Sequence, residues 1–198
     1  MTLIALKAGS GVGKNSSCAP RSLIEIKYPY AWAPLFLLLP DIMITSRHVI
    51  GKSSIDEVVF VAGFKTFVNG KSETQFSNVR VLHSKKIIYL PELDSYDLVL
   101  VRLKEKTEFY KPLTVNWNYE PTLLKSLYTI GHPLGVTLKY TTNGGASKMV
   151  NDIYFEANLD TYEGNSGSPV FDRKTHQVIG ILTEGSSGLY QSLRMQPN

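Results

Sequence analysis

Short strand-like runs follow one another along this chain, and no segment shows the 3.6-residue apolar period of an amphipathic helix. Turn-forming pairs such as Pro40-Asp41 and Asn69-Gly70 separate the runs. Val, Ile, Thr, Tyr and Phe recur within them, which favours β structure. The lack of helical segments between the runs argues against a parallel sheet with crossover helices. We therefore expect an all-β protein.

The runs form two groups, which a polar connection near 104–111 separates. The first group contains 22–27, 35–39, 42–45, 57–61, 79–82 and 98–103, and the second contains 113–117, 127–130, 138–142, 153–157, 168–171 and 178–183. Such groups predict two antiparallel six-stranded β-barrels or a sandwich, and barrel closure removes exposed strand edges. We expect a leader of uncertain structure over 1–20, an N-terminal barrel over 21–108 and a C-terminal barrel over 109–198.

The leader contains a glycine-rich stretch, AGSGVGKN at 8–15, that partly matches a phosphate-binding loop. Such a loop requires Gly where Ala8 stands and Ser or Thr where Asn15 stands. Two of its four fixed positions therefore fail, and nucleotide binding remains a distant alternative.

Composition argues against several other classes of function. Cys18 is the one cysteine, so neither an intramolecular disulfide nor a thiolate metal cluster can form within the chain. The net charge of +4 is spread along the chain, so nucleic-acid binding is not indicated. The apolar runs are too short for a conventional signal peptide or a membrane-spanning helix. We expect no membrane partner, and either a cytoplasmic location or export by a non-classical route.

The stretch GNSGSPVF at 164–171 places glycines and small polar residues in a tight turn that leads into an apolar strand. Gly tolerates unusual backbone angles, so N–H groups in this turn can point into one small space. Ser166 beside such donors has the setting of a nucleophile near an oxyanion hole. An ordinary hairpin loop is the alternative interpretation.

A candidate base and a candidate acid stand at the ends of other runs. His48 follows 42–45 where the sequence turns polar, which places an imidazole at the rim of a barrel. Asp97 opens the apolar run at 98–103, where a partly buried carboxylate needs a partner such as an imidazole N–H. Each has an ordinary alternative, an exposed histidine at a strand end or an aspartate that bonds its own turn.

Together, the order His48, Asp97 and Ser166 resembles the trypsin-fold serine peptidases. The matching motifs are ITSRHV at 44–49, YDLVLV at 96–101 and GNSGSPV at 164–170. The segments GHPLG at 131–135 and ANLDTY at 157–162 also resemble the bacterial branch with glutamyl endopeptidases and disulfide-free trypsin-like peptidases. The resemblance implies two barrels with the active site in the cleft between them. An α/β-hydrolase is excluded because Ser168 replaces the last glycine of its nucleophile motif, and because its acid and histidine would both follow the serine.

The resemblance also implies an activity and a role for each residue. Ser166 would be the nucleophile, His48 the general base and Asp97 the residue that orients the imidazole. The backbone N–H groups of Gly164 and Ser166 would form the oxyanion hole. The chain would be a serine endopeptidase that acts on a protein or peptide through an acyl-enzyme, with neither cofactor nor metal. A catalytically inactive homologue that binds peptides or proteins is the alternative.

Primary-site specificity depends on two neighbouring residues. Asp160 precedes Ser166 by six positions, where trypsin-type enzymes have the carboxylate at the base of the pocket. A buried carboxylate there favours Lys or Arg, whereas a turn cap is the alternative role. Thr161 matches a pocket residue of glutamyl endopeptidases, but Leu182 stands where those enzymes have a histidine.

Three further positions follow from the resemblance. Thr183 lies where a hydroxyl residue supports the catalytic aspartate, although an ordinary strand residue is an equal alternative. The strand with Thr183 and Gly185 is expected to pair with the substrate backbone. Asn165 replaces the aspartate of zymogen-activated members, so that activation switch is not expected. Few residues follow Gly185, and a second barrel truncated at its C-terminus is therefore one expectation.

Overall fold

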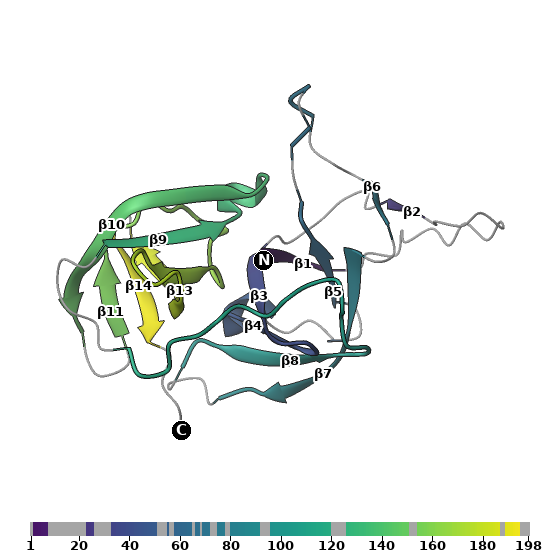
Figure 1. The fold of residues 1–198 in the computed structure, drawn as a ribbon, viewed down its shortest axis with the longest axis horizontal. Helices are drawn as coiled ribbons and strands as arrows, with labels where there is room; N and C mark the ends of the chain where they lie inside the picture. The colour runs from purple at the N-terminus through teal and green to yellow at the C-terminus, as the bar shows by residue number, and fades with distance from the viewer. Residues whose placement is uncertain are drawn as a thin grey trace.

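Two closed β-barrels of six antiparallel strands lie side by side in the computed structural model (Figure 1). It describes residues 2–7, 23–25, 33–50, 55, 58–64, 66–67, 69–71, 75–77, 80–91, 96–119, 126–150, 154–186 and 189–194. The first barrel contains, in spatial order, β1 (Thr2–Lys7), β3 (Ala33–Leu39), β4 (Ile42–Thr45), β8 (Val99–Leu103), β7 (Val81–Tyr89) and β5 (Val58–Ala62). The second contains β10 (Lys139–Met149), β11 (Tyr154–Ala157), β14 (Leu189–Arg194), β13 (Val178–Ser186), β12 (Pro169–Asp172) and β9 (Ser126–Gly131). The predicted all-β fold with two six-stranded barrels is confirmed.

Short elements accompany the barrels. Helix α1 (Arg47–Ile50) is a single turn after β4, and the 3-10 turn η3 (Pro133–Gly135) follows β9. Strands β2 (Leu23–Glu25) and β6 (Gln75–Ser77) pair with each other outside both barrels. Within the described ranges, no helix is long and apolar enough to cross a membrane.

One strand of the first barrel differs from the sequence prediction. The run at 22–27 was expected to be a barrel strand, but its described part is β2, which lies outside the barrel. Strand β1 takes that place because it pairs with both β3 and β5. The prediction of a leader over 1–20 is therefore wrong for Thr2–Lys7. The rest of that leader, with the glycine-rich stretch at 8–15, lies outside the described residues.

One strand of the second barrel also differs. The run at 113–117 contributes an isolated bridge between Val115 and Val178 and is no barrel strand. Strand β14 takes that place by pairing with both β11 and β13. The expectation of a second barrel truncated at its C-terminus is wrong, because β14 closes the barrel.

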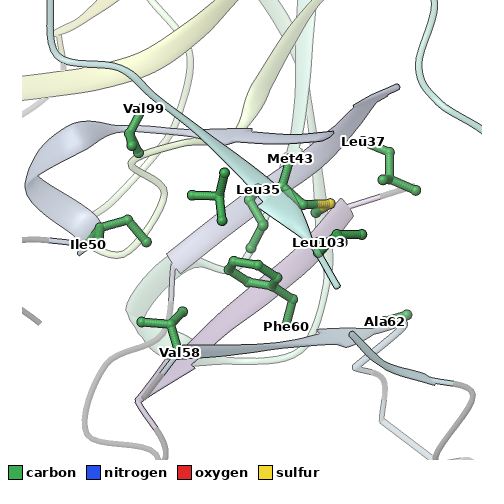
Figure 2. Close-up of a cluster of buried hydrophobic side chains, with 10 residues drawn as sticks. Leu35, Leu37, Met43, Ile50, Val58, Phe60, Ala62, Val99 and Leu103 are labelled. Carbon is green, nitrogen blue, oxygen red and sulfur yellow. The ribbon is translucent and has the colours of Figure 1, made fainter. Parts of the chain in front are cut away.

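The first barrel encloses its own apolar core. Successive side chains of a strand point to opposite faces, and the burial along β8 alternates accordingly. Leu35 of β3 and Met43 of β4 pack with Phe60 of β5 and Leu103 of β8 inside this barrel (Figure 2).

A second apolar core lies between the barrels. Phe36 of β3 and Ile44 of β4 alternate with the side chains of the first core and point away from it. They pack against the second barrel. There they meet a set of residues from β9, β12 and β13, namely Tyr128, Phe171, Val178 and Ile181. Hairpin β3–β4 therefore packs back to back with hairpin β12–β13. The segment that follows β4 and the turn that precedes β12 lie at the ends of these packed hairpins.

The segment between the barrels is hydrogen-bonded to both of them. Leu113 N donates to Leu37 O of β3, and Asn116 N donates to Val178 O of β13, each at 2.9 Å. These bonds attach the connection to the two hairpins that form the inter-barrel core.

Candidate active site

His48 and Asp97 form a close pair at the rim of the first barrel. His48 lies in α1, and Asp97 precedes β8, the strand that pairs with β4. The distance between His48 Nδ1 and Asp97 Oδ2 is 2.6 Å, and the backbone N–H of His48 donates to Asp97 Oδ1 at 3.0 Å. Both carboxylate oxygens are thus engaged by one residue, which sets the orientation of the imidazole.

The electrostatics of Asp97 favour its charged form. Burial by itself raises the pKa of this carboxyl. The hydrogen bonds from the ring and the backbone of His48, and the charge of that ring, outweigh burial and hold the pKa of Asp97 below its ordinary value. Asp97 is therefore a carboxylate near neutral pH and can stabilise a protonated imidazole.

Ser166 lies in a tight turn directly before β12. Gly164 and Gly167 both have a φ of +89°, a region that favours glycine. Asn165 N donates to Tyr162 O, and Ser168 N donates to Asn165 O. Ser166 Oγ donates to Thr183 O at 3.2 Å, which joins the turn to β13.

Some backbone N–H groups of this turn donate hydrogen bonds within the protein, and others do not. Those of Asn165, Gly167 and Ser168 donate to carbonyl groups. Those of Gly164 and Ser166 make no hydrogen bond within the described part of the chain. These two N–H groups are therefore available to an external acceptor such as a developing oxyanion.

The segments that carry His48 and Ser166 are in direct contact. Ser46 Oγ donates to Leu182 O at 2.9 Å, and Gly167 N donates to the same oxygen at 2.7 Å. A Cβ atom added to Gly167 would lie 2.1 Å from Thr45 Oγ1, so the turn is pressed against the end of β4. The candidate base and the candidate nucleophile thus belong to segments that meet where the barrels join.

The predicted specificity residues have different surroundings. Asp160 is exposed, so the premise of a buried carboxylate does not hold. Thr161 is buried, and its Oγ1 has no hydrogen-bond partner among the residues that the structure describes. Thr183 is buried on β13, and Gly185 of the same strand pairs with Tyr190 of β14.

The trypsin-like peptidase domain family matches residues 36–181, which is most of the chain. The chain belongs to this family. The match includes β4, β8, β12 and the segments with His48, Asp97 and Ser166.

Relatives and solved structures agree with the trypsin-like peptidase fold. The glutamyl endopeptidase of Staphylococcus aureus strain MRSA252 is 25% identical over 177 residues, covering 84% of this chain and 47% of its own length. The glutamyl endopeptidase of strain MW2 is also 25% identical, and the match covers 51% of its length. The chain therefore spans about half the length of these relatives. The serine endoprotease from Yersinia pestis superposes with a TM-score of 0.68 at 13% identity, covering 98% of this chain and 58% of that one. The inactive form of the Rv3671c protease superposes with a TM-score of 0.65 at 16% identity, and the match covers 98% of this chain and 82% of that one.

Sequence analysis did not identify two residues near the site of this trypsin-like domain. Ser46 is fully buried between β4 and α1, and its position in a polar pair after an apolar strand is the sequence signal for it. His132 is fully buried beside η3, and Leu134 of that turn donates to Glu163 O just ahead of the Ser166 turn. Burial lowers the pKa of His132 to about 4, although a hydrogen bond to Val136 O opposes this.

Among the side chains that the structure describes, no group of three His, Cys, Asp or Glu residues is arranged to hold a metal ion.

Proposed function

We propose that this chain is a serine endopeptidase that hydrolyses peptide bonds through an acyl-enzyme. The observation that carries the proposal is the 2.6 Å contact between His48 Nδ1 and Asp97 Oδ2. Because Nδ1 faces the carboxylate, Nε2 lies on the opposite edge of the ring, where it can take a proton from a nucleophile. The contact between the His48 and Ser166 segments makes Ser166 the candidate for that nucleophile.

The proposed reaction proceeds in two halves. Ser166 Oγ attacks the carbonyl carbon while His48 Nε2 takes its proton, and the N–H groups of Gly164 and Ser166 bind the oxyanion. The carbon–nitrogen bond then breaks as His48 returns the proton to the leaving amine, which gives the acyl-enzyme. Water attacks this ester with His48 as base, and Ser166 regains its proton when the acid leaves. Asp97 remains a carboxylate and stabilises the imidazolium in each half.

An activity-based label tests the proposal. A fluorophosphonate should modify the purified chain at Ser166, since labelling requires an activated serine. Ser166→Ala should abolish the label and lower peptide hydrolysis by about 10⁴-fold or more. The matched control is Ser147→Ala, because Ser147 is an exposed serine on β10 whose hydroxyl donates to Glu156 O. Hydrolysis at the parental rate by Ser166→Ala would overturn the proposal.

The alternative hypothesis, a catalytically inactive homologue that binds peptides, predicts the opposite result with the same label. Such a protein would remain unmodified at Ser166 while still binding peptides. The few residues after Gly185 favoured that alternative because they predicted a truncated second barrel, whereas that barrel is closed.

Two preferences compete at the proposed primary site. Asp160 favours Lys or Arg, but its carboxylate is exposed and water screens its attraction. The relatives are named glutamyl endopeptidases, and the buried Thr161 hydroxyl could donate to an acidic side chain. Fluorogenic peptides that differ only in Lys, Arg, Glu or Ala before the cleaved bond separate the two. Asp160→Asn should weaken cleavage after Lys and Arg only if Asp160 lines the pocket.

A further inference from the structure

The carbonyl of Leu182 accepts hydrogen bonds from both halves of the proposed site. Gly167 N donates to it at 2.7 Å, and Ser46 Oγ donates to it at 2.9 Å. A carbonyl oxygen has two lone pairs and can serve both donors. Leu182 N in turn donates to Ser168 O, so this residue of β13 is fixed against the Ser166 turn.

Gly167 and Ser46, the two donors, are close in the sequence to the two residues proposed to exchange a proton. Gly167 follows Ser166 directly, and Ser46 precedes His48 by two positions. Ser46 and Leu182 are 136 residues apart in the sequence, so their bond joins the first barrel to the second. One carbonyl thus links the segment of the base to the segment of the nucleophile.

Other hydrogen bonds also join the two barrels, such as that from Leu138 N to Phe64 O and that between Thr66 Oγ1 and Thr137 Oγ1, but these do not involve the segments that carry His48 and Ser166. The inter-barrel core is apolar, and apolar attraction is non-directional. A hydrogen bond depends steeply on distance and angle. Ser46 Oγ is therefore suited to fix the end of β4, and with it α1, relative to the Ser166 turn.

We propose that Ser46 is a positioning residue, which sets the separation between His48 and Ser166 through the Leu182 carbonyl. This inference rests on the proposed function. Loss of the hydroxyl would release the His48 segment from β13, and misplacement of catalytic groups by about 1 Å can cost about 10²-fold in rate.

The effect on rate can be separated from the effect on stability. In Ser46→Ala the Leu182 carbonyl retains its bond from Gly167 N, so no buried acceptor is left unpaired. The variant should therefore fold. Ser84→Ala is the control, because Ser84 is also a buried serine, and its hydroxyl bonds to carbonyl groups of the first-barrel region only, at 2.7 Å to Val58 O and also to Ile55 O.

The experiment measures melting temperature, kcat and KM on one fluorogenic peptide. Both alanine variants should lower the melting temperature by a similar amount. Only Ser46→Ala should lower kcat, by about tenfold or more, with KM within about twofold of the parent, because alignment matters most in the transition state. The pH midpoint of kcat should not move, because the bonds between His48 and Asp97 remain.

Two outcomes overturn the inference. One is a Ser46→Ala protein with kcat within twofold of the parent, and the other is an equal loss of kcat in Ser84→Ala. If Ser46→Ala does not fold, Ser46→Cys decides, because a thiol keeps a weak donor at similar volume. It should lower kcat at least about threefold, and parental kcat would count against the inference. A parent chain that shows no Ser166-dependent cleavage would instead refute the proposed function.

Discussion

Gly167 shows how closely the two halves of the site approach. Its φ of +89° lies in the left-handed region, and a Cβ atom there would be 2.1 Å from Thr45 Oγ1 and 2.2 Å from Pro34 O. Both neighbours belong to the first barrel, whereas Gly167 belongs to the second. At this position a side chain is excluded by backbone conformation and by space.

Gly167→Ala should therefore lower the free energy of unfolding by about 2–4 kcal/mol. Gly70→Ala is the control, because Gly70 has a similar φ of +78° but nothing within 4 Å of an added Cβ. In Gly70→Ala the free energy of unfolding should fall only by the cost of the backbone conformation, about 1 kcal/mol. Urea denaturation of both variants measures the difference, and equal losses would show that the contact with the first barrel is unimportant.

At the scale of the elements, hairpins β3–β4 and β12–β13 place the site. Each hairpin divides its apolar side chains between its own barrel and the shared core, as Leu35 and Phe36 do on β3. The residues just after β4 and just before β12 are thereby brought together. Barrel closure supports this arrangement, because β14 pairs with β13 along most of its length.

Ser192→Pro should break this closure. Ser192 pairs with Phe155 of β11 on one side and with Leu182 of β13 on the other. Proline removes its N–H from the middle of a strand that has neighbours on both sides, which should cost more than about 2 kcal/mol. Ser192→Ala keeps the N–H and should melt near the parent temperature. Thermal unfolding followed by circular dichroism compares the two, and similar melting temperatures would contradict the role of β14.

On the scale of the whole molecule, the barrels share one apolar core and several buried polar groups. His132 is fully buried, and its Nε2 has no hydrogen-bond partner among the described residues. Its ring centroid lies 6.0 Å from that of Phe64 in the first barrel. Protonation of this ring would place an uncompensated charge at the junction of the two barrels.

Stability should therefore fall between pH 6.5 and about 4. The pKa of His132 is about 4 in the folded chain, against 6.5 as its ordinary value. In this window the unfolded state binds the proton and the folded state does not, so the free energy of unfolding decreases as the pH falls. The full effect is on the order of 3 kcal/mol.

Urea denaturation at several pH values tests this expectation. His132→Asn should remove most of the dependence on pH in that window, whereas His83→Asn, at an exposed histidine, should retain it. A parent and a His132→Asn protein with equal slopes would contradict the assignment.

Local patterns were sufficient for the fold class, whereas the pairing of His48 with Asp97 was expected from the resemblance of their motifs to those of trypsin-fold peptidases. The apolar runs and turn residues report their own neighbourhoods, and His48 and Asp97 stand at the ends of two strands that pair with each other. Thr2–Lys7 and Leu189–Arg194 were not recognised as barrel strands. Thr2 pairs with Phe36, for example, and the sequence around neither residue indicates that pairing.

By itself, then, the sequence determined the β-rich architecture, the family motifs and the candidate residues, because these depend on residue types at near positions. The tertiary structure alone decided which strands close each barrel, that Asp160 is exposed while Thr161 and His132 are buried, and that Ser46 bonds to Leu182. Burial and long-range hydrogen bonds depend on which segments meet in space, and that is set by the packing of the whole chain.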